Sequence, residues 1–207
     1  MKFYQEITLL PDVIEDEEYG RKKGIYFLWH KIFQQIHFAL VNIKNADNKV
    51  SVGISFPEYV NSSDKKKNQL GSKIRLFAET KEELEKLNIE KYLARFSDYI
   101  HSTKIRPTPF ARVQEYAVFS RWSVDLNPER LARRYAKRNE VSYEEALERY
   151  ENFKEKAKPP YVQLKSVSGK RDFRLYISKK VVEQPQSGLF TCYGLSPSEP
   201  YVTVPLF

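Results

Sequence analysis

The sequence predicts an α+β protein in two parts, and three observations lead to this prediction. Residues 2–106 alternate strand-like and helix-like segments in the order strand, helix, strand, strand, helix, strand. The segment Arg106-Pro107-Thr108-Pro109 favours an extended connector, because each proline restricts its own backbone and that of the residue before it. Beyond this connector, strand-like segments accompany an arginine-rich helix. We therefore expect a ferredoxin-like domain over 1–106 and a smaller α+β domain over 107–207 that presents this helix.

Hydrophobic periodicity and stop signals define the elements of the first part. Residues 2–10 alternate side-chain character as a half-buried strand does, and Pro11 ends them. Residues 25–43 repeat apolar side chains at helical spacing. Thr80 and Glu83 form a capping box that opens a short helix. The predicted elements are strands at 2–10, 50–56 and 71–78, helices at 25–43 and 80–87, a strand or bent connection at 92–106, and loops at 11–23 and 58–69.

The second part is defined by caps and turns. Asn127 suits the position before a helix and Pro128 its first turn, so a helix is expected to run from there to Asn139. Ser142 and Glu145 form a second capping box. The predicted elements are a strand at 111–122, helices at 128–139 and 142–156, a hairpin of 161–167 and 172–178 joined at Ser168-Gly169-Lys170, and a β-rich tail at 190–194 and 201–207.

The helix NPERLARRYAKRN concentrates positive charge on one stripe, because its cations follow helical spacing. Leu131, Ala132, Tyr135 and Ala136 supply the side that packs. A solvated surface helix is one interpretation of such a charge run, and a nucleic-acid-binding face is the other. We favour the second, since like charges one turn apart repel unless a polyanion meets them. The stripe consists of Arg130, Arg133, Arg134, Lys137 and Arg138.

Composition narrows the class of protein and of partner. The formal net charge of +8 over 207 residues favours RNA, DNA or an anionic membrane as partner. Cys192 is the only cysteine, so no intramolecular disulfide is possible and a cytoplasmic location is expected. The first twenty residues contain no long apolar run, so we expect neither a signal peptide nor a membrane span. No zinc-ligand spacing, dinucleotide fingerprint or Walker A loop occurs, so we expect no metal and no cofactor.

Histidine is then the remaining candidate for chemistry at neutral pH. His30, His37 and His101 are present, and a lone histidine is more often structural. An RNA substrate makes a catalytic role for a single histidine more plausible, because RNA carries its own nucleophile in the 2′-hydroxyl beside each phosphate. One histidine acting as general base contributes about 10²–10⁴-fold. A single histidine is thus sufficient for RNA cleavage, whereas DNA hydrolysis needs an activated water.

Several motifs in order resemble a known family. They are His37 in IFQQIHFALV, the helix NPERLARRYAKR, Ser166 and Phe173 in LKSVSGKRDFRLY, and Tyr193 in FTCYGLS. Together they resemble the CRISPR repeat-processing endoribonucleases of type I-F systems, over almost the whole chain. The resemblance implies an N-terminal ferredoxin-like domain and a C-terminal domain with the basic helix. It also implies cleavage of precursor CRISPR RNA at the 3′ base of each repeat hairpin, retention of the product, and other subunits of a surveillance complex as partners.

The resemblance assigns roles to four residues near the cut. His37 matches the general base that acts on the 2′-hydroxyl, and Ser166 matches the serine that holds that ribose hydroxyl. Tyr193 matches the tyrosine that orients the histidine, and Phe173 matches an aromatic that stacks on a base at the foot of the stem. Structural readings stay open beside these roles: a strand hydroxyl for Ser166, a packed aromatic for Tyr193, and a core position for Phe173, which shares parity with Leu175 and Ile177.

The resemblance also assigns RNA-binding residues. Arg133, Arg134, Lys137 and Arg138 match the helix that enters the major groove of the hairpin, with Arg130 on the same stripe. Arg121 matches an arginine that reads a guanine edge. Three positions depart from the family pattern. Ser123 replaces a glutamine that reads an adenine and is too short for that contact, while Lys137 and Ala132 each replace an arginine. The details of stem readout therefore do not transfer to this chain.

Two other functions remain open at this point. One is a non-catalytic subunit that binds the RNA hairpin within a ribonucleoprotein complex. The other is a DNA-binding regulator that uses residues 127–138 as its recognition helix, although no preceding helix with a glycine turn accompanies it.

Overall fold

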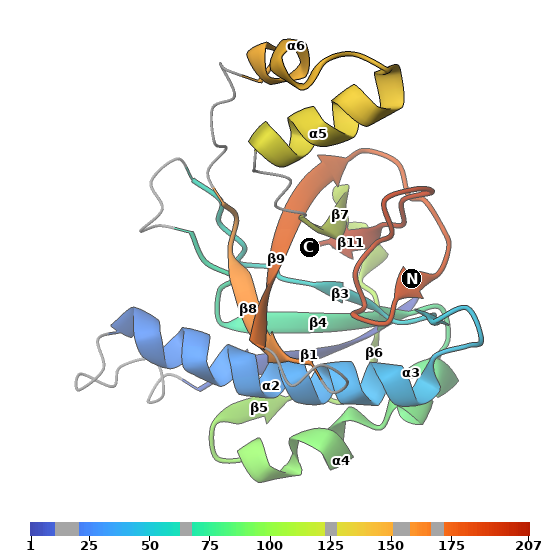
Figure 1. Ribbon diagram of the computed structural model, residues 1–207. Coiled ribbons are helices and arrows are strands. Elements are labelled where there is room, and N and C mark those ends of the chain that lie inside the picture. The colour runs from blue at the N-terminus through green and yellow to red at the C-terminus, as the bar shows by residue number, and fades with distance from the viewer. Residues whose placement is uncertain (11–20, 63–67, 123–127, 151–157, 167–171) are drawn as a thin grey trace. The chain divides into compact units, whose positions relative to one another are not determined.

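The computed structural model describes residues 1–10, 21–62, 68–122, 128–150, 158–166 and 172–207 (Figure 1). The chain forms two compact units, one of Met1–Trp122 with Pro159–Phe207 and one of Ser123–Lys158. Sheets and helices both contribute, so the α+β class is confirmed. The division into domains 1–106 and 107–207 stays a prediction. None of the helices in the described ranges is long and apolar enough to cross a bilayer.

The first sheet is antiparallel and has the strand order β3-β4-β1-β5. β1 occupies its middle, where Ile7 lies opposite both Ile74 and Ser102. Gln5 is buried on β1, and its amide donates to Ser102 Oγ at 3.2 Å and to the Thr103 carbonyl at 2.9 Å. The strands are β1 (Phe3–Leu9), β3 (Gly53–Ser55), β4 (Lys73–Ala78) and β5 (Ile100–Ser102), with β6 (Arg106–Pro107) also pairing with β1.

Three helices accompany this sheet: α2 (Arg21–Ile43), α3 (Lys81–Leu87) and α4 (Ile89–Leu93). α2 buries Ile32, Ile36 and Leu40, and its Trp29 Nε1 donates to the Gly71 carbonyl at 2.6 Å. The capping box predicted before α3 is confirmed, since Thr80 and Glu83 each accept from the other's backbone N–H. α2 begins at Arg21, so the loop predicted over 11–23 ends earlier than expected; residues 11–20 lie outside the described ranges.

The second sheet has the order β11-β7-β9-β8. β9 is its longest strand and pairs with β7 on one side and β8 on the other, both antiparallel. Trp122 N–H donates to the Tyr176 carbonyl, and Ile177 N–H donates to the Pro160 carbonyl, each at 2.9 Å. Both ends of the segment that contains the second unit are thereby held by consecutive residues of β9. The strands are β7 (Glu115–Arg121), β8 (Tyr161–Lys165), β9 (Asp172–Val182) and β11 (Val204–Leu206).

The single strand predicted at 50–56 is wrong, because this segment divides between two sheets. β2 (Lys49–Val50) pairs with β10 (Phe190–Thr191), whereas β3 pairs with β4. Gly53 marks the division: a Cβ there would lie 2.4 Å from Phe190 Cζ. The position of this break is determined by pairing with residues near Phe190. The alternation of side chains within 50–56 contains no information about that distant segment.

Other boundaries also differ from the sequence prediction. The region 92–106 begins with the end of α4 and a 3₁₀ turn at Ala94–Phe96 before β5 forms. Ile89, Leu93 and Phe96 are buried at helical spacing, a pattern that the prediction of a strand or bent connection overlooked. α6 covers Tyr143–Glu148 of the helix predicted over 142–156, and Ser142 accepts from Glu145 N–H as expected for its cap. Residues 151–157 and the turn Ser168-Gly169-Lys170 lie outside the described ranges.

Candidate active site

His37 lies on α2 at the edge of the buried face, half-buried beside Ile36. Its Nδ1 is 3.0 Å from the backbone carbonyl oxygen of Cys192. Because a carbonyl only accepts, the neutral ring carries its proton on Nδ1 and donates it there. The lone pair of the neutral imidazole therefore lies on Nε2, the nitrogen that a general base uses.

The turn at FTCYGLS presents both the Cys192 carbonyl and the Tyr193 ring to His37. The turn is closed by Thr191, whose N–H and Oγ1 both donate to the Leu195 carbonyl at 2.8 and 2.9 Å. Gly194 has φ +69° and packs so closely that a Cβ would lie 2.5 Å from Ile54 Cγ1. Only glycine satisfies both conditions, so the glycine in this motif holds the two preceding residues in place.

Three aromatic rings form the candidate active-site cluster. The rings of His37 and Tyr193 stack with centroids 4.3 Å apart and planes 9° from parallel. Phe173, near the start of β9, meets Tyr193 edge to face at 6.4 Å and 78°. Residues from α2, β9 and the C-terminal turn thus converge although the sequence separates them widely.

The electrostatics of this cluster favour neutral side chains. Burial lowers the pKa of His37 below its usual value; the hydrogen bond to Cys192 opposes this change, and the positive charge of Lys44 adds to it. Burial raises the pKa of Tyr193, and so does its neighbour Cys192, while the charge of Arg121 acts in the opposite direction. At neutral pH the imidazole is therefore an unprotonated base beside a phenol that keeps its proton.

The other residues predicted at this site take different places. Arg121 ends β7, opposite Ile177, and is exposed. Ser166 follows β8 and is half-buried; the N–H of the preceding Lys165 donates to Gln34, three residues before His37. His101 is exposed on β5 opposite Thr8, and His30 accepts from Gln163 N–H at 2.8 Å. Of the three histidines, His37 is the one that stacks on Tyr193.

The second unit presents the basic helix α5 (Pro128–Asn139) packed against α6. Ala132 and Ala146 are fully buried, and Arg149 donates to Tyr135 Oη at 2.9 Å while its guanidinium lies 4.8 Å from the Tyr135 ring centre. This packing leaves exposed those side chains of the charged stripe that the structure describes. The exposed members of the stripe are Arg133, Arg134, Lys137 and Arg138.

One acid lies within the stripe. Glu129 pairs with Arg133 at 3.6 Å, but both side chains are more than half exposed, so the pair neutralises little of the field. α5 carries five cations and this one acid, which gives a formal charge of +4. Arg130 lies on α5, and its side chain is outside the described residues, as is the whole of Ser123.

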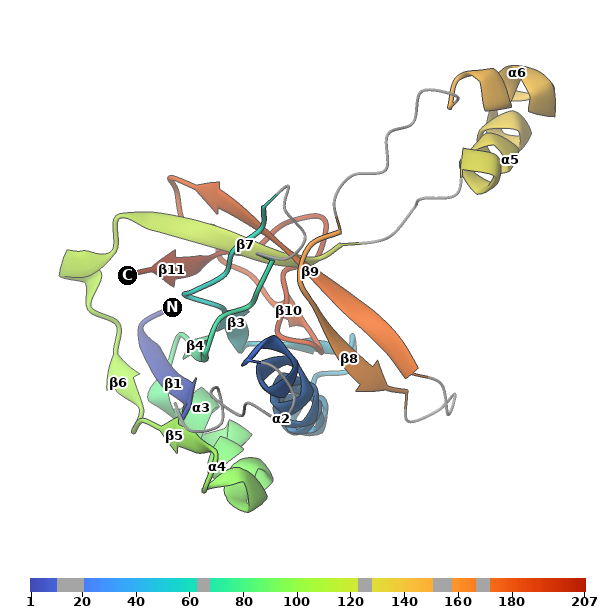
Figure 2. The same ribbon diagram turned by 90° about the vertical axis from the view of Figure 1, so that its left-hand side faces the viewer.

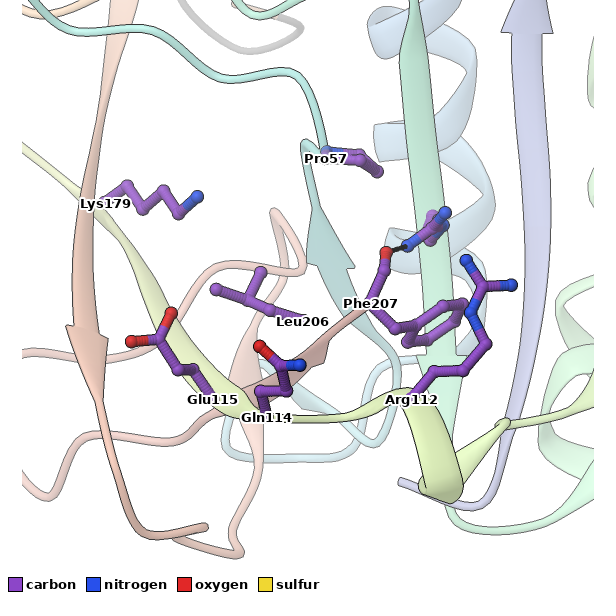
Figure 3. A pocket seen from close by; sticks show the side chains of 8 residues that line it. Pro57, Arg112, Gln114, Glu115, Lys179, Leu206 and Phe207 are labelled. Carbon is purple, nitrogen blue, oxygen red and sulfur yellow. Dashed lines mark hydrogen bonds between the residues drawn. The ribbon is translucent and has the colours of Figure 1, made fainter.

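The structure also contains a cavity of about 380 Å³, whose lining side chains are drawn in Figure 3. Arg75 donates from Nη1 to the Phe207 backbone oxygen and pairs from Nε with Glu6, each at 2.6 Å. None of the lining residues belongs to the His37 cluster. They are Pro57, Arg75, Arg112, Gln114, Glu115, Lys179, Leu206 and Phe207.

Sequence reasoning missed three contributions to the surroundings of His37: the Cys192 carbonyl and the contacts of His30 and Gln34 with β8. The Cys192 carbonyl fixes the proton on His37, but a backbone oxygen leaves no residue-type signal in a sequence. His30 and Gln34 contact β8, and the relevant signal was their spacing of seven and three residues from His37, which places all three on one helical face.

Comparison with known proteins supplies the family. The model of the family described as CRISPR-associated protein (Cas_Csy4) matches residues 4–207. The chain belongs to the Cas_Csy4 family. This membership confirms the family resemblance that the motifs indicated.

Two relatives of this Cas_Csy4 chain carry the same name, CRISPR-associated endonuclease Cas6/Csy4. The one from Escherichia coli (strain UTI89 / UPEC) is 29% identical over 209 residues, which cover 100% of both chains. The one from Pseudomonas aeruginosa (strain UCBPP-PA14) is 32% identical over 202 residues, which cover 95% of this chain and 96% of the relative.

Proposed function

We propose that this protein is a metal-independent endoribonuclease that binds the CRISPR repeat hairpin. It cleaves precursor CRISPR RNA at the 3′ base of the stem, leaves a 5′-hydroxyl and a 2′,3′-cyclic phosphate, and stays bound to the product. The observation that carries the proposal is the hydrogen bond from His37 Nδ1 to the Cys192 carbonyl, because it leaves Nε2 as the proton acceptor. The name shared by the two relatives supports the reaction class.

The proposed reaction is an internal transesterification. His37 Nε2 takes the proton of the 2′-hydroxyl, and the 2′ oxygen forms a bond to the adjacent phosphorus. The bond from phosphorus to the 5′ oxygen breaks, and that oxygen takes a proton from solvent water and leaves as a hydroxyl. Ser166 holds the ribose hydroxyl, and Tyr193 orients the imidazole ring of His37. Phe173 stacks on a base at the foot of the stem.

Binding is assigned to the basic helix and to Arg121. Arg130, Arg133, Arg134, Lys137 and Arg138 contact the stem, and Arg121 reads a guanine near the cut. Ser123 makes no two-point contact with adenine, so this chain reads that position differently from the family pattern. About five phosphate contacts give a log–log salt slope of roughly −4, with the hairpin treated as a duplex.

The architecture supports the proposal at the level of fold. The antiparallel order β3-β4-β1-β5 with α2 and α3 agrees with a ferredoxin-like first domain over 1–106, and residues 107–207 contribute the helix and the hairpin of β8 and β9. The remaining subunits of a type I-F surveillance complex are the proposed protein partners, in the cytoplasm.

The test is a cleavage assay on the host's repeat hairpin in the presence of EDTA. Wild-type protein should cut it, and His37→Ala should abolish cutting while hairpin affinity is retained. Tight binding without cutting by the wild type would instead identify a non-catalytic subunit. If the protein prefers duplex DNA to the hairpin in a competition assay, the result would favour the alternative function of a DNA-binding regulator.

A further inference from the structure

Two side chains of α2 cover the free edge of strand β8. β8 is the last strand of its sheet, so the backbone N–H groups that face away from β9 lack a strand partner. His30 Nδ1 accepts the N–H of Gln163 at 2.8 Å, and Gln34 Oε1 accepts the N–H of Lys165 at 2.9 Å. The helix and the strand are in contact, as Figures 1 and 2 show. Side chains of the helix therefore take the place that a further strand would occupy.

The two hydrogen bonds follow one another in the same chain order on both elements, His30 with Gln163 and then Gln34 with Lys165. Four residues of helix, from His30 to Gln34, advance about 6 Å. Two residues of strand, from Gln163 to Lys165, advance about 6.6 Å. Both elements then reach a proposed active-site residue: His37 follows Gln34 by three residues, and Ser166 follows Lys165 by one.

The contact at His30 is reinforced by its surroundings. Its ring stacks on Tyr161 with centroids 6.0 Å apart and planes 21° from parallel, and the guanidinium of Arg174 lies over the Tyr161 ring, 4.8 Å from its centre. Because Nδ1 accepts, the neutral ring carries its proton on Nε2, the opposite of the arrangement in His37. Burial lowers the pKa of His30, and the charge of Arg174 adds to this, so the accepting form persists at neutral pH.

Only one of the two polar atoms of the Gln34 side-chain amide has a hydrogen-bond partner among the described residues. Its Oε1 accepts from Lys165, whereas its Nε2 is buried with no hydrogen-bond partner in the described part of the chain. A glutamine used only for stability would gain little from such an arrangement, because an unsatisfied buried donor costs free energy. The accepting oxygen is thus the useful part of the side chain.

We infer that His30 and Gln34 are positioning residues, which fix the register of β8 on α2 and so set the position of Ser166 relative to His37. The inference rests on the proposed function, because it concerns the same reaction. A serine displaced along the strand would no longer hold the 2′-hydroxyl in line with the base. A displacement of about 1 Å costs up to roughly 100-fold in rate even when binding is unchanged.

Matched substitutions separate the accepting atom from the bulk of each side chain. Gln34→Met removes the acceptor at similar length, and Gln34→Glu retains an accepting oxygen. His30→Phe keeps the ring on Tyr161 without an acceptor, and His30→Asn keeps an acceptor without the ring. Gln35→Met is the control, because the side chain of Gln35 points about 100° away around the helix axis.

Three measurements are made on each full-length variant: the single-turnover cleavage rate, the Kd for an uncleavable hairpin, and hydrogen exchange of the Gln163 and Lys165 amides by NMR. We expect Gln34→Met and His30→Phe to cleave about 10- to 100-fold more slowly with Kd within about twofold of wild type. The amide of Lys165 or Gln163, respectively, should lose protection. Gln34→Glu and His30→Asn should restore most of both properties, and Gln35→Met should match wild type.

The outcomes distinguish this inference from the proposed function. Wild-type cleavage rates in both acceptor-free variants, with amide protection lost, would overturn the positioning role and leave the nuclease intact. Unchanged amide protection in those variants would overturn the contact itself. A wild-type protein that binds the hairpin without cutting it would refute the proposed function, and the positioning role with it, whatever the amides show.

Discussion

The imidazole of His37 and the phenol ring of Tyr193 lie face to face, with their centroids 4.3 Å apart. Stacked rings of this kind restrict rotation about the terminal side-chain bond, which would otherwise be broad for histidine. The hydrogen bond from Nδ1 to the Cys192 carbonyl fixes the same rotation from the side. The ring and the carbonyl come from consecutive residues, so one turn of the chain sets both the orientation of the His37 imidazole and the location of its proton.

The stacked face of Tyr193 should matter more than its hydroxyl. Tyr193→Phe keeps the ring and should retain most of the cleavage rate, whereas Tyr193→Leu removes the stacking, worth about 0.5–1.5 kcal/mol, and should slow cleavage accordingly. Single-turnover rates on the repeat hairpin measure the difference. A larger loss in Tyr193→Phe than in Tyr193→Leu would assign the effect to the hydroxyl.

The cleavage rate should depend on pH through the protonation of His37. A general base works unprotonated, and burial lowers the pKa of this imidazole, so the rate should be level at neutral pH and fall as the pH drops through that lowered value. Lys44→Gln removes a positive charge that contributes to the lowering, so it should move the acid limb to higher pH. Lys31→Gln, which removes a positive charge elsewhere on α2, should leave the dependence of the rate on pH unchanged.

The same pKa changes should appear in stability. His30 and His37 both have a lowered pKa in the folded protein, so the unfolded chain binds more protons once the pH falls below about 6.5. The free energy of unfolding should therefore be highest above that value and decrease towards the folded pKa of each residue. Urea titrations between neutral and acid pH measure it, and a combined His30→Asn and His37→Ala variant should show a weaker dependence.

Arg134→Ala should weaken binding of the repeat hairpin. If Arg134 contacts a base edge, the loss should be about 1–3 kcal/mol; if it contacts phosphate, the loss should be smaller and the salt slope should shrink by about one. Filter binding at several salt concentrations separates these cases. Arg95→Ala, which removes an exposed arginine on the first unit, is the charge-matched control. Equal effects of the two substitutions would mean that α5 contributes only general charge.

Arg75→Met should destabilise the first unit. The guanidinium pairs with Glu6 at 2.6 Å, donates to the Phe207 oxygen, and lies 4.1 Å from the Phe207 ring centre. Both charged side chains are less than one-fifth exposed, so loss of these contacts should cost about 1.5–3 kcal/mol. Chemical denaturation measures this, with the exposed pair of Lys81 and Glu85 as a control that should contribute far less.

Local signals predicted the elements that local contacts determine. The strand around Ile7, the helix capped by Thr80 and the basic helix all appear where alternation, capping and spacing placed them. The strand expected at 50–56 failed because Phe190, far along the chain, pairs with Val50. Tertiary pairing of this kind leaves no trace in a short window of sequence.

The residues of the candidate site likewise divide into those that local sequence patterns indicated and those that they did not. Charge spacing alone indicated the stripe of α5, whereas the roles of Ser166, Tyr193 and Phe173 came from the family resemblance. Helical spacing places His30 and Gln34 on the same face as His37, but their partners on β8 could not be predicted, since each contact joins a side chain to a backbone N–H more than 130 residues away. A backbone N–H is present at nearly every residue, so sequence does not indicate which ones a helix will cover.

The excursion of the chain between Trp122 and Pro160 starts and finishes on adjacent residues of β9. The two ends of this segment are therefore fixed at one point of the sheet, as the two ends of a hairpin loop are. If α5 binds the repeat as proposed, exchanging this segment should change which repeat is recognised and leave His37 in place. Engineers can attempt the same exchange to retarget the nuclease.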